Sequence, residues 1–275
     1  MQINNTQLNQ DTYLNLNQSL NRIGTGQQLN SAANDASSLA IAQNLQVQSS
    51  GISQSVDNIS SSFATIQIAD QAVGKQSEIL DQVKEKLLQA STDTTSQDGR
   101  KALLNDIQGL LENFNDISSS TNYNGQTLLQ ASSEDSSATS GLEFQTGVES
   151  SDSISLAAIQ SNTSGVGLNG LLNQDSESFT SEQARAYLES VDSALTSVND
   201  YRSELGSTQN QLQSSSQNMI SQLTQTNNAT SILQDVDYAN EVSNFSKQNI
   251  LAQIGAYGAA QSNNINQSIV SRLLS

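Results

Sequence analysis

The sequence predicts a mainly α protein, with long antiparallel coiled-coil helices and a small β-hairpin insertion. Two features carry this prediction. Each half of the chain holds a series of apolar residues at heptad spacing, and such a narrow stripe needs a partner helix to bury it. The 275 residues also contain no proline, so no proline interrupts a long helix. Because each stripe is the simplest partner for the other, we expect the chain to fold back on itself, with both termini at one end.

The N-terminal segment, residues 1 to about 35, is weakly amphipathic. Gly24 and Gly26 interrupt it, and since glycine within a helix costs about 1 kcal/mol relative to alanine, we expect a bend or loosening there. Arg22 stands on a sparse basic background, and it either pairs with an acid across an interface or stays solvated. The residues of this segment that we expect in a terminal coiled coil are Leu8, Leu16, Leu20, Arg22 and Ile23.

The first heptad helix is predicted from about residue 38 to 91. A polar turn follows over residues 91–99, and then a shorter helix over about 100–117 has one apolar face that an antiparallel return onto the first helix would bury. The predicted core of a helical rod comprises Ile52, Val56, Ile59, Phe63, Ile66 and Val73, and the same series continues to Leu80 and Leu87.

The residue composition of the chain changes after residue 121. Asn124-Gly125 is a strong turn signal that favours positive φ. Residues 131–180 are rich in Ser, Thr, Gly and acid. Within them, alternating apolar and polar residues predict a β-hairpin over 141–148 and 153–159 that turns through 149–152. We expect residues 164–170 to be a flexible loop.

The second heptad helix is predicted from an N-cap at Thr180 to about residue 233. Its contribution to the rod core is Leu195, Val198, Leu205, Leu212 and Met219. Asp235 and Asp237 then break the register, and we interpret them as helix-capping residues rather than as an acid–base pair. A last amphipathic helix carries the remaining predicted coiled-coil residues, Val242, Phe245, Ile250, Leu251, Ile254, Ile265, Ile269, Leu273 and Leu274.

These elements predict two domains. Residues 1–39 together with 236–275 would form a terminal coiled-coil layer. Residues 40–235 would form the helical rod, which carries the hairpin and loop region at 131–180. Isolated helices are marginal in water, and neither terminal segment is strongly apolar. We therefore expect both to be disordered in the free chain and to order on assembly.

Composition excludes several functions. The formal net charge is −17, from 27 acidic and 10 basic residues. This balance leaves no basic surface to bind nucleic acid, and an acidic surface is a poor match for an anionic membrane. Since Cys and His are absent, we expect no zinc, copper or haem site, no catalytic triad and no thiol enzyme, and so neither an enzyme nor a cofactor. No window approaches 18 consecutive apolar residues, and no secretory-signal pattern is present. By these rules alone the protein would be cytosolic.

Three separated blocks resemble the bacterial flagellin family. Residues 20–42, LNRIGTGQQLNSAANDASSLAIA, are similar to the family's L-x-R-L-S-S-G-x-R-I-N-S-A-x-D-D-A-A-G-x-A-I. Residues 122–129, NYNGQTLL, resemble its F-N-G-x-x-L-L step. The family's C-terminal block is similar to three segments of this chain, residues 232–239 (ILQDVDYA), 246–253 (SKQNILAQ) and 271–275 (SRLLS). The likeness covers roughly residues 1–130 and 180–275, so the large outer domains of many flagellins are missing.

The chain departs from the signature at a few positions. Gln27 and Gln28 stand where an arginine normally follows the signature glycine, and Asn34 replaces the first acid of a pair. Ser37-Ser38 stand where glycine is usual. These changes leave the implied fold intact and could tune the packing of a filament.

The resemblance implies a structural subunit that polymerises into the extracellular flagellar filament for motility. It also implies export in the unfolded state by the flagellar type III apparatus, which replaces the cytosolic expectation with a secreted one. The terminal segments would line a central channel. The implied partners are other copies of the chain in a helical homopolymer, the hook-associated and cap proteins, the type III export gate, and an export chaperone on the C-terminal segment. Neither nucleic acid nor a membrane is implied.

The resemblance also bears on innate immunity. Flagellins recognised by Toll-like receptor 5 resemble L-Q-R-V-R-E-L on the first long helix, and the matching residues 80–86 read LDQVKEK. Gln82 stands at the key arginine and Lys86 at the leucine, with Lys84 and Glu85 between them. Losing a planar bidentate donor and an apolar anchor predicts poor receptor activation. The alternative is that these are ordinary solvated helix residues.

Two other functions stay open on the sequence. One is a hook–filament junction protein that shares the terminal helices. The other, of a different class, is a soluble coiled-coil adhesin or signalling protein, which would form a stable dimer with ordered ends and no polymer.

Overall fold

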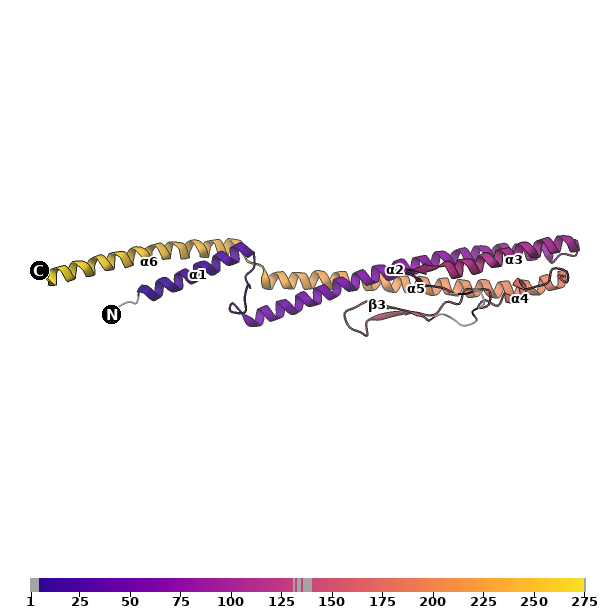
Figure 1. Cartoon of the computed structure of the whole chain (residues 1–275), viewed down its shortest axis with the longest axis horizontal. Coiled ribbons are helices and arrows are strands. Elements are labelled where there is room, and N and C mark those ends of the chain that lie inside the picture. Colours follow the sequence, from indigo (N-terminus) through magenta and orange to yellow (C-terminus); the bar gives the residue numbers. More distant parts are fainter. Residues whose placement is uncertain (1–4, 131, 133–134, 136–139, 275) are drawn as a thin grey trace. The chain divides into compact units, whose positions relative to one another are not determined.

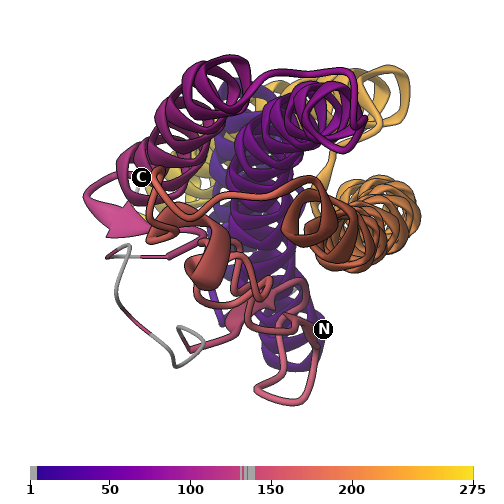
Figure 2. The same ribbon diagram turned by 90° about the vertical axis from the view of Figure 1, so that its right-hand side faces the viewer.

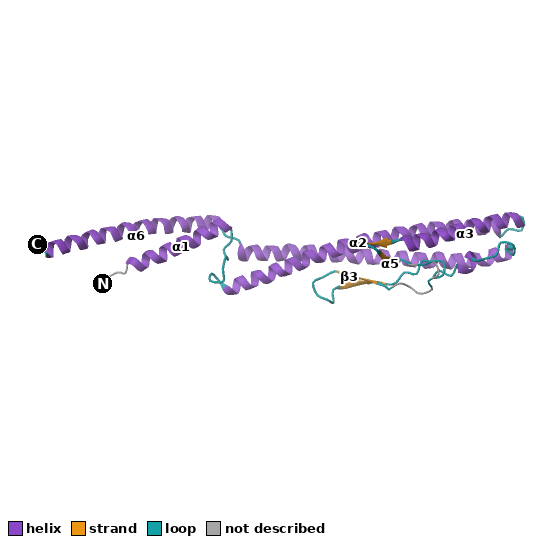
Figure 3. Cartoon of the chain, viewed as in Figure 1, coloured by secondary structure: helices purple, strands orange, loops and turns teal. Residues whose placement is uncertain are grey.

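The computed structural model describes residues 5–130, 132, 135 and 140–274. Helices dominate (Figure 3), which confirms the predicted mainly α fold with small β-hairpins. In chain order the elements are α1 (Asn5–Thr25), α2 (Ala36–Ala90), α3 (Gln97–Ser120), β1 (Asn122–Tyr123), β2 (Gln126–Thr127), β3 (Leu142–Gln145), β4 (Ser153–Leu156), α4 (Asn169–Leu172), α5 (Ser181–Gln234) and α6 (Tyr238–Leu273). Figure 1 labels the main ones along the chain.

The chain forms two compact units, and each is described by itself. The terminal unit comprises Met1–Ser50 and Leu223–Ser275, and the middle unit comprises Gly51–Gln222. Both divisions fall inside the long helices α2 and α5. The boundaries expected near residues 39 and 236 lie instead close to the breaks that separate α1 from α2 and α5 from α6.

A seven-residue repeat of apolar side chains forms the core of the middle unit. On α2 it consists of Ile52, Ile59, Ile66, Val73, Leu80 and Leu87, each at most 2% exposed. On α5 the fully buried Val191, Val198, Leu205 and Leu212 repeat at the same spacing. Contacts between the two helices run in reverse order, since Lys84 pairs with Asp192 and Asp70 with Arg202, while Ile59 and Leu212 line one groove. The two heptad helices are therefore antiparallel partners, as predicted.

The helix α2 has a second buried stripe, but its residues are not the ones that the sequence predicts. Val56 and Phe63 are only half-buried. The stripe lies instead three residues after the first and consists mostly of small or polar residues, namely Ser55, Ser62, Ala69, Gln76, Val83 and Ala90. Small side chains let neighbouring segments approach α2 closely. The buried positions of this stripe are therefore not those that carry the largest apolar side chains. On α5, Leu195 and Met219 are likewise half-buried against the core.

The helix α3 packs beside α2, where Lys86 pairs with Asp106, and its Leu104, Ile107, Leu111 and Phe114 are fully buried. Figure 2 looks along α2, α3 and α5 and shows the segment that carries α4 beside them. The expectation of a flexible loop at 164–170 is wrong. Val166 and Leu168 are buried in the core, and α4 begins at Asn169. The glycines of that stretch serve a packed turn, as the backbone bond from Leu168 N to Thr163 O, 2.7 Å, illustrates.

Both predicted turns form. The step from Asn124 to Gly125 joins β1 to β2 with φ angles of 50° and 81°, as the Asn-Gly signal indicates. The hairpin expected within 141–159 forms as β3 and β4, paired antiparallel from Leu142 with Leu156 to Gln145 with Ser153.

Side-chain caps fix where the helices begin. Thr180 Oγ1 accepts from Gln183 N at 3.2 Å while Gln183 Oε1 accepts from Thr180 N at 3.0 Å, which is a reciprocal capping box. Asp237 accepts from the Ala239 and Asn240 amides, so its capping role is confirmed. Asp35 caps α2 in the same way, and its hydrogen bonds from Ser38 lower the pKa of its carboxyl.

In the terminal unit, α1 packs against α6. The segments that precede α2 and α6 are tied to one another, because Gln28 N donates to Gln234 O at 2.7 Å and Val236 N donates to Gly26 O at 3.0 Å. Gly26 has a φ of 71°, a conformation that favours glycine and that ends α1 where a break is predicted. On the parts of α2 and α5 that belong to this unit, Ser49 Oγ donates to Asn227 Oδ1 at 2.7 Å.

Within the described residues, none of the helices combines the length and hydropathy needed to span a bilayer. The same residues contain no group of three or more acidic, Cys or His side chains arranged to hold a metal ion.

Candidate assembly surface

The contact between α1 and α6 buries few large side chains. Among the described side chains of the seam, Ser19 on α1 and Glu241 and Ala252 on α6 are buried, while Leu16, Ile23 and Phe245 are half-buried. Arg22 lies 3.8 Å from Glu241, whose side chain is only 10% exposed. The structure thus pairs Arg22 with an acid of its own chain. A seam of this composition holds the two helices together only weakly, because apolar burial is the main source of packing energy.

Most of the remaining predicted coiled-coil residues are exposed. Their side chains are between 47% and 83% accessible, and the set comprises Leu20, Val242, Ile250, Leu251, Ile254, Ile265, Ile269 and Leu274. The side chains of Leu8 and Leu273 lie outside the described residues. Four further apolar or aromatic side chains on these helices are exposed and lie outside the predicted coiled-coil set, namely Tyr13, Leu14, Tyr257 and Val270. We call these exposed residues together the assembly surface.

The two terminal helices differ in length. At 1.5 Å per residue, the 36 residues of α6 span about 54 Å and the 21 residues of α1 about 32 Å. Because the Arg22–Glu241 pair aligns the end of α1 with the start of α6, the described part of α1 does not extend to the end of α6. Accordingly, from Ala260 onward every described side chain of α6 is exposed.

Charge is distributed unevenly between the units. The terminal unit holds three basic residues (Arg22, Lys247, Arg272) and five acidic ones (Asp11, Asp35, Asp235, Asp237, Glu241), so its net charge is −2. The middle unit holds the other seven basic and 22 acidic residues, a net charge of −15. Residues 248–271 of α6 include no charged side chain. The assembly surface is therefore apolar and almost uncharged.

The basic residues of the middle unit are used within the chain. Six of the seven form ion pairs there: Lys75 with Glu78, Lys84 with Asp192, Lys86 with Asp106, Lys101 with Glu177, Arg185 with Asp93, and Arg202 with Asp70. The seventh, Arg100, donates to the Thr95 carbonyl at 2.5 Å. In the described part of this unit, the surface therefore presents many more unpaired carboxylates than unpaired cations.

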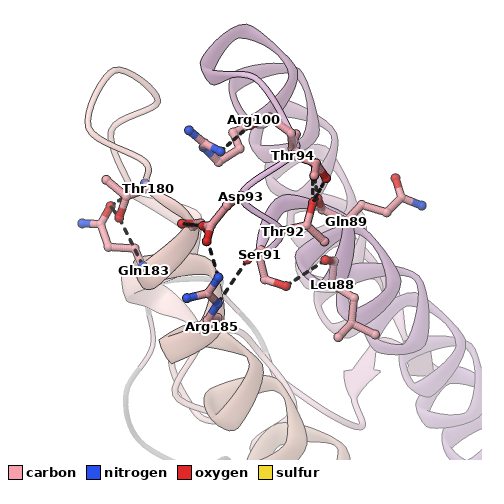
Figure 4. A network of polar contacts seen from close by, with 12 residues as sticks. Leu88, Gln89, Ser91, Thr92, Asp93, Thr94, Arg100, Thr180, Gln183 and Arg185 are labelled. Carbon is pink, nitrogen blue, oxygen red and sulfur yellow. Dashed lines mark hydrogen bonds and ion pairs between the residues drawn. The ribbon is translucent and has the colours of Figure 1, made fainter.

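One of these ion pairs, Arg185 with Asp93, connects α5 to the turn after α2 at one end of the middle unit (Figure 4). Asp93, in the turn after α2, accepts from Ser181 Oγ at 2.7 Å and from Arg185 Nη2 at 3.2 Å. Arg185 Nε also donates to the Ser91 carbonyl at 3.1 Å. The Ser181 hydrogen bond, and next the charge of Arg185, lower the pKa of Asp93. Nearby, the hydrogen bond to Glu177 raises the pKa of Lys101.

The segment at 80–86 is divided between core and surface. Leu80 and Val83 are fully buried, whereas Gln82 and Glu85 are exposed. Lys84 Nζ lies 2.5 Å from Asp192 on α5, and Lys86 Nζ lies 2.8 Å from Asp106 on α3. Both lysines thus connect α2 to neighbouring helices of the same chain.

Long paired helices, an exposed apolar surface on the terminal pair and a solvated acidic middle define a structural, helix-built protein. Residues 1–134 match the family model for the bacterial flagellin N-terminal helical region, and residues 188–273 match that for the bacterial flagellin C-terminal helical region. The chain belongs to the bacterial flagellin family, a family of structural proteins and not of enzymes.

Relatives of similar length align along almost the whole chain. A flagellin of Halalkalibacterium halodurans is 29% identical over 94% of this chain and 93% of that protein. The flagellin of Bacillus subtilis is 28% identical over 92% and 91%, respectively. Flagellin A of Helicobacter felis is 41% identical over 56% of this chain, but that match spans only 28% of the Helicobacter protein.

Two solved structures share the fold. The crystal structure of Bacillus cereus flagellin matches with a TM-score of 0.51 and 23% identity, over 59% of this chain and 88% of that one. A protein described as a flagellar hook-associated protein of Vibrio parahaemolyticus matches with a TM-score of 0.60 and 12% identity, over 73% and 99%.

Proposed function

We propose that this chain is a subunit of the extracellular bacterial flagellar filament, where copies of it form a helical homopolymer for motility. Family membership supports this proposal, and the single observation that carries it is the uncharged, exposed apolar surface of α6, which includes Leu251 and Ile254 and continues beyond the reach of α1. Large exposed apolar patches are typical of interaction sites. A second copy of the chain carries the same apolar surface, so two copies can cover each other's exposed side chains.

Point variants on α6 test the proposal. Replacing Leu251 and Ile254 together by serine should raise the protein concentration needed for polymerisation by at least about tenfold, since each buried side chain contributes about 1.5–3 kcal/mol. Leu88→Ser, at an apolar residue of the middle unit that is 50% exposed, is the matched control and should polymerise normally. Negative-stain microscopy after salt-induced polymerisation gives the readout. Normal filaments from the double variant would refute the proposal.

In this proposal, residues 1–39 and 236–275 form the inner coiled-coil layer, and residues 40–235 form the next. The sparse seam between α1 and α6 supports ordering on assembly, because a helix pair with little burial is marginal alone. Hydrogen exchange on the free subunit should therefore show much weaker protection over 5–25 and 242–273 than over the α2 core. Equal protection in both regions would contradict this.

The proposed route to the filament is type III export in the unfolded state. The proposed partners are the export gate, an export chaperone on the C-terminal segment, and the hook-associated and cap proteins. The exposed α6 surface supports a chaperone, because a free subunit would otherwise present it to water. Binding of the flagellar export chaperone to wild type, but not to the Leu251 and Ile254 double variant, is the expected result of a titration.

A junction protein is the second candidate. Its support is the fold shared with the Vibrio parahaemolyticus hook-associated protein, although the matched family models are those of flagellin. Junction proteins occur in few copies, so abundance in sheared filaments separates the two functions.

We also propose that the chain activates Toll-like receptor 5 poorly. Gln82 and Glu85 are exposed on α2, while Lys84 and Lys86 are held in ion pairs within the chain. The segment therefore offers neither a planar bidentate donor nor a free apolar anchor. A receptor reporter assay should show weak activation, and restoring Gln82→Arg together with Lys86→Leu should strengthen it. Nanomolar potency of the wild-type protein would refute this proposal.

A further inference from the structure

The chain contains two Asn-Gly steps, and the structure places them in different surroundings. Asn124-Gly125 forms the turn between β1 and β2, whereas Asn169-Gly170 opens α4. From this contrast we propose that Asn124 is a site of spontaneous deamidation in the folded protein, and that Asn169 is protected from the same reaction.

The chemistry at such a step needs only water. The Gly125 amide nitrogen loses its proton and attacks the side-chain carbonyl carbon of Asn124. A new C–N bond closes a five-membered succinimide ring, the bond to the side-chain nitrogen breaks, and ammonia leaves with the proton returned. Water then opens the ring at either carbonyl and leaves aspartate or isoaspartate. One water is consumed and one ammonia is released, with no change in oxidation state.

The turn at Asn124 leaves this attack open. Both residues of the step are exposed, and a Cβ placed on Gly125 would meet nothing within 4 Å. Among the described residues, the Asn124 side chain has no hydrogen-bond partner that would hold its amide away from the backbone. Ring closure requires the backbone to rotate out of the turn. Within the described residues, the short pairing of Asn122 with Thr127 and of Tyr123 with Gln126 in β1 and β2 resists that rotation, together with the next backbone bond, from Leu128 N to Thr121 O at 3.0 Å.

The backbone at Asn169 is held much more firmly. The Asn173 side chain donates to the Asn169 carbonyl at 3.0 Å and to its Oδ1 at 3.3 Å, and the Asn173 amide donates to the same carbonyl at 3.1 Å. Tyr187 Oη donates to the Gly170 carbonyl at 3.1 Å. The neighbours Leu168 and Leu171 are fully buried. Rotation here would break these bonds and pull core side chains out of place.

The two products would affect the middle unit differently. Aspartate at position 124 adds one negative charge to a unit whose net charge is already −15. Isoaspartate adds one atom to the backbone path of a two-residue turn, and that shifts the register of β1 against β2. The shift would occur beside the buried Leu128 and Leu129, so the isoaspartate form should lose local protection there.

Peptide mapping by mass spectrometry tests the proposal in the full-length folded chain. After incubation at mildly alkaline pH, aspartate and isoaspartate should accumulate at Asn124 several-fold faster than at Asn169. In denaturant the two rates should become similar, because both steps then lack structure. Equal native rates, a faster reaction at Asn169, or no native reaction at Asn124 would overturn the proposal.

Two variants make the assignment specific. Asn124→Gln should abolish the native signal, since glutamine closes the larger ring much more slowly, whereas the matched Asn169→Gln should leave it unchanged. If Asn124→Gln fails to fold, the comparison of both sites within the wild-type chain still decides the matter.

Discussion

At the scale of single residues, Gln76 shows how a polar side chain can organise an apolar core. It is fully buried on α2, and its Nε2 donates to the Phe114 carbonyl at 3.0 Å and to the Ser161 carbonyl at 2.7 Å. Nearby, Asn115 exchanges hydrogen bonds with Thr163 at 3.0 and 2.9 Å. These amides fix the segment after β4 onto α2 and α3.

Replacing Gln76 by leucine should destabilise the middle unit by about 2–4 kcal/mol, because two buried carbonyls lose their donor. Chemical denaturation measures this as a lower midpoint. Gln71→Leu, at an exposed position of the same helix, should change stability by less than about 0.5 kcal/mol. A neutral Gln76→Leu variant would show that the two bonds contribute nothing net.

Asp93 makes the stability of the folded chain depend on pH in the acidic range. Its pKa is lowered by Ser181 and Arg185 from an ordinary value of 3.8. A depressed folded pKa means that the stabilising contribution is complete above 3.8 and is lost as the pH falls through the lower folded value. Asp93→Asn should therefore be destabilising at about pH 6, and this deficit should shrink as the pH falls below 3.8. A deficit that stays constant over this range would contradict the assignment.

At the scale of elements, the start of α5 depends on a local signal. The capping box formed by Thr180 and Gln183 satisfies two amides that the helix cannot. Thr180→Ala should cost about 1 kcal/mol of stability in denaturant. Thr196→Ala is the matched control, since it removes a threonine from the exposed interior of the same helix, where alanine is the better helix former.

Elements set by local chemistry were the predictable ones. Asn124-Gly125 and Thr180 mark a turn and a cap through their own preferences, and the isoleucines at 52, 59 and 66 mark a core by size. The second stripe of α2 was not predictable, because Ser62, Ala69 and Gln76 carry no apolar signal. Gln76 is buried only because carbonyls 38 and 85 residues away accept its hydrogen bonds. The packing of Val166 and Leu168 depends likewise on distant partners.

At the scale of the whole molecule, charge partition bears on assembly. Neighbouring copies would bring together middle units of net charge −15, with six of their seven basic residues already in ion pairs. Repulsion between like charges is screened by salt, with a Debye length of about 10 Å at 0.1 M. Polymerisation of this chain should therefore require appreciable ionic strength.

Neutralising exposed carboxylates tests this directly. Glu112→Gln with Asp116→Asn on α3 should lower the salt concentration at which filaments form, whereas Asp11→Asn in the terminal unit should change it little. Light scattering during a salt titration follows the transition. Filament formation that is indifferent to salt, or a larger effect of Asp11→Asn, would contradict the role of charge partition.

The ties between the two helix breaks have an evolutionary consequence. Gln28 bonds to Gln234 and Val236 to Gly26, so the connecting stretch between α1 and α2 and the one between α5 and α6 are matched in length. Inserting one residue into either stretch alone would leave an amide and a carbonyl unmatched and rotate the following helix by about 100°. Viable insertions or deletions at these two places should therefore occur together, in compensating pairs.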